Sequence, residues 1–305
     1  MGTVLLATHL GSLLSLPVFL LLPDAGALAA ATALSFLHFA ATLVFYYGQA
    51  ERDRRFRALG VYLPLALLAG GAAWMLASPT SLAGALLVFF VLVLWHYAKQ
   101  SYGLFVYSFR GLGGFDHHDS LERQAVLGAF LWLALYGFVA MQTNPSAQLA
   151  FGLYVPSAHL PVGPVATIGR AGAALALAYL SFVCVRYRRF APFATALAFW
   201  VWCDLPLTGF RLVPYLPALH ALQYFPVVGW RFSRRGRRVA LALGFAGFAS
   251  AGALGFVLRG VPRFAPALVA FLYAAELTMN LQHYFIDAYI WRAREPGVRA
   301  DLELG

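Results

Sequence analysis

Apolar segments of 18 or more residues recur along the whole of this 305-residue chain. Each is long enough to cross a bilayer, because a transmembrane helix needs about 20 predominantly apolar residues. The chain is 61% hydrophobic and only 11% charged, which is more apolar than a soluble core requires. Alternation of polar and apolar residues with a period of two, typical of outer-membrane barrels, is absent. The sequence therefore predicts an all-α, polytopic integral membrane protein.

Breaks at proline, glycine and charged residues divide the chain into about ten transmembrane helices. We expect these helices to form a single bundle over residues 1–305, with no separate soluble domain. The predicted segments are approximately 3–22, 27–48, 59–76, 82–108, 125–141, 165–185, 192–207, 214–230, 239–258 and 266–291.

Arginine residues follow the even-numbered segments and are scarce after the odd-numbered ones. The chain has a net charge of +10, and the distribution of this charge indicates membrane topology and not a nucleic-acid partner. Because basic loops stay on the cytoplasmic side, we expect a bacterial inner-membrane protein with both termini cytoplasmic. The residues that carry this signal are Arg52, Arg54, Arg55, Arg57, Arg110, Arg186, Arg188, Arg189, Arg231, Arg234, Arg235, Arg237, Arg238, Arg292, Arg294 and Arg299.

The last predicted segment carries four polar side chains that step along the sequence by four, three and four residues: Glu276, Asn280, His283 and Asp287. This spacing places them on one helical face. Polar groups inside a membrane are costly and usually face the protein interior. We expect the opposite face, which carries Leu277, Phe285 and Ile286, to contact lipid.

Four histidines fall at similar depth in even-numbered segments, which all run in the same direction: His38, His96, His220 and His283. Imidazole is the commonest protein ligand for iron, zinc and copper. The pattern therefore predicts that the four rings converge on one metal ion. Iron is the expected metal, with zinc and copper as alternatives.

Further polar residues share these helical faces and would support such a centre. We expect one set to orient the imidazole rings, namely Glu276, Asn280, Asp287, Gln100, Gln223 and Lys99. Tyr46 and Tyr224 are the candidate catalytic residues, because a phenol hydroxyl can hydrogen-bond a metal ligand or a bound oxygen species.

Other interpretations of the same residues stay open. A single histidine in a membrane helix often makes only an interhelical hydrogen bond, so the polar groups could simply lock the helices of an assembly factor together. The buried carboxylates Glu276 and Asp287 could instead form the path of a proton-coupled transporter. The run DHHD at 116–119 could bind a metal, but a solvated turn explains it better, because no further ligand is nearby in the sequence.

Four short motifs resemble the Brp/Blh family of membrane enzymes that cleave β-carotene to retinal. They are THLG at 8–11, SFLHFA at 35–40 (or LWHYAK at 94–99), HALQY at 220–224 and HYFIDAYIWR at 283–292. The resemblance implies a non-haem iron held by histidines and an oxygen-dependent cleavage of a carotenoid. The chain departs from the family at Tyr224, which replaces a second histidine, and after His9, where no aspartate follows.

Together, these features predict a metal-dependent oxidoreductase that acts on a hydrophobic lipid or polyene. Its partners would be membrane lipids and this hydrophobic small molecule, with no nucleic acid.

Overall fold

The structure, a computed structural model, describes residues 2–21, 24–47, 58–77, 79–110, 112, 115, 120–143, 157–208, 216–235, 244 and 266–290. All regular structure in these residues is helical, as nine α-helices and one short π-helix. Nine of the ten predicted segments are helical in the described residues. The largest difference between a predicted and an observed boundary is at the end of the eighth segment, where the helix continues to Arg235. The segment predicted at 239–258 lies outside the described residues, apart from Gly244.

The chain forms two compact units. The first comprises Met1–Ala31 and Phe90–Pro226, and the second comprises Thr32–Phe89 and Val227–Gly305. The boundaries fall inside three helices, α2 (Asp24–Tyr47), α5 (Pro79–Tyr107) and α9 (Leu216–Arg235), so each of these contributes to both units. The expected single bundle stays a prediction.

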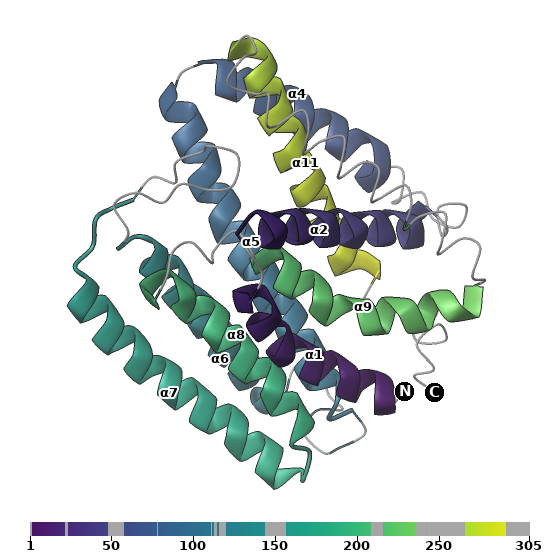
Figure 1. The fold of residues 1–305 in the computed structure, drawn as a ribbon, viewed down its shortest axis with the longest axis vertical. Coiled ribbons are helices and arrows are strands. Elements are labelled where there is room, and N and C mark those ends of the chain that lie inside the picture. The colour runs from purple at the N-terminus through teal and green to yellow at the C-terminus, as the bar shows by residue number, and fades with distance from the viewer. Residues whose placement is uncertain are drawn as a thin grey trace. The chain divides into compact units, whose positions relative to one another are not determined.

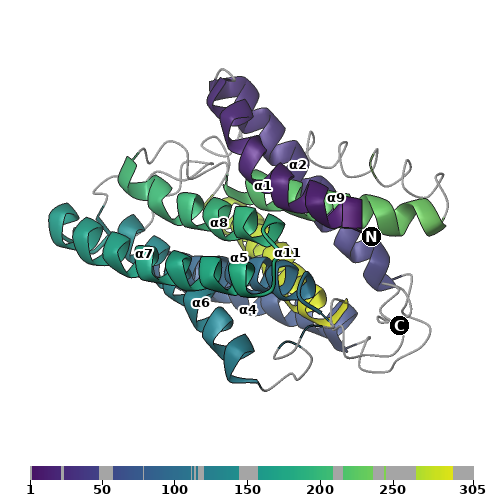
Figure 2. The same cartoon turned by 90° about the horizontal axis from the view of Figure 1, so that it is seen from below.

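In the first unit, α6 (Leu121–Met141), α7 (Val162–Arg186) and α8 (Ala191–Thr208) pack against one another, and α1 (Gly2–Leu21) packs on α8 (Figures 1 and 2). Ser120 caps α6 by accepting a hydrogen bond from the backbone N–H of Arg123. Aromatic side chains fill the core between the helices, including Phe105, Phe109, Phe130 and Phe199.

Helix α7 is built in the opposite way to a helix of a soluble protein. Its buried line consists mostly of small residues, beginning with Gly169, Ala173 and Ala176. Several of its large apolar residues point outward, and Ile168, Leu175 and Phe182 are 66%, 74% and 56% exposed. Small residues at helix contacts with bulky apolar residues outside are typical of membrane helices.

Two of the described helices, α6 and α7, are long and apolar enough to cross a membrane, judged by length and composition. Their close approach depends on glycine. A Cβ atom at Gly169 would overlap the ring of Tyr136, and one at Gly172 would overlap the indole of Trp132.

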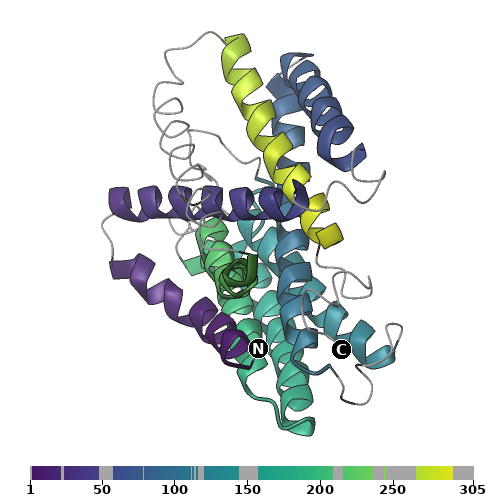
Figure 3. The same cartoon turned by 90° about the vertical axis from the view of Figure 1, so that its right-hand side faces the viewer.

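In the second unit, α11 (Pro266–Ile290) packs along α4 (Leu63–Ala77), which follows the short π-helix η2 (Ala58–Tyr62) (Figure 3). The Gln282 side chain donates a hydrogen bond to the carbonyl of Gly60 at 3.4 Å and so ties α11 to η2. The predicted lipid-facing side of this helix was partly wrong. Phe285 is exposed, but Ile286 is completely buried, because the packed face of α11 is wider than the polar stripe alone indicated.

Candidate metal centre

The second unit brings His38 of α2 and His283 of α11 together. Their ring centroids lie 4.4 Å apart with the planes nearly perpendicular, at 78°. Phe39, the residue after His38, packs against His283 with a centroid distance of 4.9 Å. Both imidazoles are almost fully buried.

Asp287 lies one helical turn after His283 on α11. Its Oδ2 atom is 3.5 Å from Nε2 of His283, and its Oδ1 atom accepts a hydrogen bond from the Thr42 hydroxyl at 3.0 Å. All three side chains are buried. A carboxylate beside one ring nitrogen fixes the orientation of a histidine and leaves the other nitrogen as the ligand atom.

The first unit brings together the other two histidines, His96 of α5 and His220 of α9. Their Nε2 atoms are 3.1 Å apart, and their ring centroids are separated by 4.9 Å. Tyr97 stacks on His220 at 4.2 Å, with an angle of 29° between the planes. The two Nε2 atoms therefore face a common point, and the stacked ring holds His220 in place.

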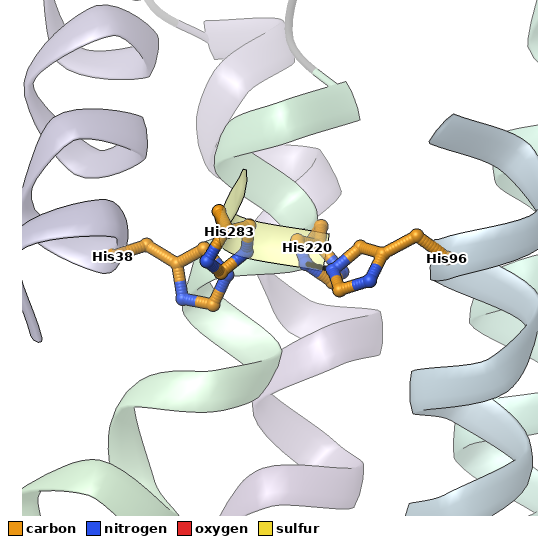
Figure 4. Close-up of side chains that lie close together, drawn as sticks. All are labelled: His38, His96, His220 and His283. Atoms are coloured by element: carbon orange, nitrogen blue, oxygen red, sulfur yellow. Dashed lines mark hydrogen bonds between the residues drawn. The ribbon is translucent and has the colours of Figure 1, made fainter. Parts of the chain in front are cut away.

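The four histidines form a group that could hold a metal ion. Each offers one ring nitrogen, and these four atoms all lie within 4.8 Å of one another. Figure 4 shows the four rings turned toward one another. Nitrogens on opposite sides of an ion at about 2.1 Å would be about 4.2 Å apart, which is comparable with this spacing. Each residue is at most 4% exposed.

Gln100 and Gln223 lie close to this group but do not contact an imidazole ring through any bond described. Gln100 Nε2 donates to Gln223 Oε1 at 3.2 Å and to the backbone carbonyl of His220 at 3.4 Å. Ser101 also donates to Gln223 Oε1, at 3.5 Å. The two amides therefore pair with each other across α5 and α9.

The remaining predicted residues occupy varied positions. Tyr224 is buried on α9, and Asn280 accepts a hydrogen bond from Tyr284 within α11. The Lys99 ammonium lies 5.9 Å from the ring centroids of both Trp95 and Tyr102, its neighbours on α5. The side chains of Tyr46 and Glu276 lie outside the described residues, as does the DHHD run at 116–119.

His9, a fifth buried histidine, has a different role. Its Nδ1 atom lies 2.7 Å from the Thr195 hydroxyl and its Nε2 atom 2.8 Å from the Ser108 hydroxyl. Ser108 also donates to the carbonyl of Leu104. Both ring nitrogens of His9 therefore have a hydroxyl partner, and His9 links α1, α8 and the turn after α5 inside the first unit.

Two features were missed by the sequence analysis. The first is Tyr97, since nothing in the sequence indicates that it stacks on His220. Thr42 follows His38 by four residues and therefore lies on the polar face of the same helix, where it donates a hydrogen bond to Asp287.

The second missed feature is an ion pair in the first unit. Arg170 of α7 donates two hydrogen bonds to Asp204 of α8, at 2.9 and 3.0 Å, and Tyr136 of α6 donates a third. The three groups satisfy one another and connect three helices.

No family model, curated protein or solved structure matches this chain. The resemblance to the Brp/Blh family thus stays a prediction, and the site has to be interpreted from its own chemistry.

Proposed function

We propose that this chain is a multi-span membrane protein that holds one transition-metal ion on His38, His96, His220 and His283. The observation that carries the proposal is the group of four buried imidazoles within 4.8 Å. A set of nitrogen ligands without thiolate suits iron, copper or zinc, and iron is the metal we favour.

The membrane location is part of the same proposal. It is supported by the outward apolar face of α7, since a soluble monomer rarely exposes large contiguous apolar surface. The arginine clusters after the even-numbered segments support ten spans with both termini cytoplasmic, in a bacterial inner membrane.

The histidines must supply neutral rings with a free nitrogen. The short Nε2–Nε2 contact between His96 and His220 requires one of these rings to carry its proton on Nε2. To bind an ion through both atoms, that ring must move its proton to Nδ1. Asp287 lies beside Nε2 of His283 and would hold the proton on that atom, so that Nδ1 would be the ligand atom.

The reaction we propose is the oxidation of a hydrophobic lipid or polyene. A bound iron would supply dioxygen activation. The chain's own contribution is a dry, apolar surrounding, because Phe39 and Tyr97 pack directly on the histidine rings and exclude water. Such surroundings suit a substrate that enters from the bilayer.

Metal analysis of the purified protein tests this proposal. We expect about one iron per chain, lost when one histidine of either pair is replaced, as in His38→Ala or His96→Ala. His159→Ala is the matched control, because His159 is exposed and is not part of the group. Wild-type protein that binds no transition metal after loading would contradict the proposal.

The alternative is a proton-coupled transporter. The buried contact of Asp287 with His283 and Thr42 favours it, since paired carboxylates and histidines also form proton paths in membranes. Proton movement by metal-free protein in liposomes, lost in Asp287→Asn, would support this function instead.

A further inference from the structure

The amide pair of Gln100 and Gln223 is incompletely satisfied. One hydrogen bond joins the two side chains, from Gln100 Nε2 to Gln223 Oε1. The other polar atom of each amide, Oε1 of Gln100 and Nε2 of Gln223, is buried and has no hydrogen-bond partner. Gln223 is completely buried. An unpaired buried donor or acceptor is costly, and each case in a native fold calls for an explanation.

The pair occupies the same helical faces as two members of the histidine group. Gln100 follows His96 by four residues, and Gln223 follows His220 by three. These spacings place each glutamine about one turn from its histidine and on the same side of the helix. Gln100 also donates to the backbone carbonyl of His220, so the amide pair adjoins the histidine pair within the first unit.

The two free atoms define the ligand that would satisfy them. Gln223 Nε2 is a donor and Gln100 Oε1 is an acceptor, so the matching group must be able both to accept and to donate. Two neutral amides cannot compensate a buried charge, which argues against an ion. A hydrocarbon would leave both atoms unpaired. A hydroxyl group meets both requirements.

We propose that the Gln100–Gln223 pair binds a hydroxyl group, either of water or of an amphiphilic substrate. One part of this inference rests on the proposed function: the bound hydroxyl group would position an apolar substrate beside His96 and His220. The substrate class would then be a long-chain or polyene alcohol in preference to a pure hydrocarbon.

The test compares wild-type protein with the double variant Gln100→Met/Gln223→Met. The probes are a polyene alcohol and a polyene hydrocarbon of the same conjugation length, and binding is followed by the shift of polyene absorbance at fixed detergent concentration. Wild-type protein should bind the alcohol about fivefold more tightly, the value of one neutral hydrogen bond. The double variant should lose this preference and bind the hydrocarbon at least as well.

The double variant is expected to fold, because it removes the free donor and the free acceptor together and keeps the side-chain length. Should it fail to fold, Gln100→Met alone takes its place, since it removes the free acceptor and retains the bond from Ser101 to Gln223. Ser101→Ala is the control and should keep the preference for the alcohol.

Iron content is measured on the same samples, which separates the two proposals. Protein without iron that still prefers the alcohol would overturn the metal function and support the hydroxyl site. If wild-type protein shows no preference between the alcohol and the hydrocarbon, an experimental density map decides whether the bound hydroxyl group is that of a water molecule. A water bonded to Gln100 Oε1 or Gln223 Nε2 would support the proposal, and its absence from both atoms would overturn it.

Discussion

At the scale of single residues, the candidate centre depends on how each imidazole is oriented. Asp287 lies beside His283 and accepts a hydrogen bond from Thr42, and Tyr97 stacks on His220. These contacts restrict the rotation of the His283 and His220 rings, which exposed histidines would not experience. The importance of Asp287 can be tested separately from that of the four histidines.

Replacing Asp287 by asparagine should weaken metal binding by about 10- to 100-fold, the usual effect of removing a carboxylate behind a ligating histidine. The amide can still accept the hydrogen bond from Thr42, so the fold should be retained. Competition with a chelator of known affinity measures the change. Thr42→Val is the milder companion variant, with an expected loss below tenfold. Unchanged affinity in Asp287→Asn would show that this carboxylate does not support the site.

At the scale of helices, the sequence was informative because apolar runs ended by proline, glycine or arginine leave few other choices. The helical period and the depth of each histidine within its predicted segment together also selected the four histidines, since residues three or four apart share a helical face. Other contacts between helices far apart in the sequence were not predictable. The pairing of Arg170 with Asp204 and the stacking of Tyr97 on His220 depend on packing that no local pattern encodes.

The contact between α6 and α7 gives a prediction at this scale. Gly169→Ala should lower the free energy of unfolding by about 1–3 kcal/mol, the usual cost of overpacking, because the new methyl group would overlap Tyr136. Gly163→Ala in the same helix is the matched control, since nothing lies within 4 Å of its Cβ position. Thermal unfolding in detergent measures both. Equal stability of the two variants would mean that α6 and α7 do not approach closely at Gly169.

At the scale of the whole molecule, the ten-span layout predicts which loops face the cytoplasm. A reporter enzyme active only outside the cytoplasm should be active when fused after Thr143, which follows the fifth predicted segment. It should be inactive when fused after Arg189, which lies in a basic cluster after the sixth. Activity at both positions, or at neither, would show that α7 does not cross the membrane.

The central claim is that all four histidines bind one ion, and X-ray absorption at the edge of the bound metal tests it most directly. We predict a first shell of nitrogen or oxygen at about 2 Å and outer-shell scattering that requires four imidazoles. In His38→Ala and in His96→Ala, any metal that remains should show fewer rings. A spectrum fitted by two imidazoles or fewer, or one that contains a sulfur shell, would contradict the shared centre.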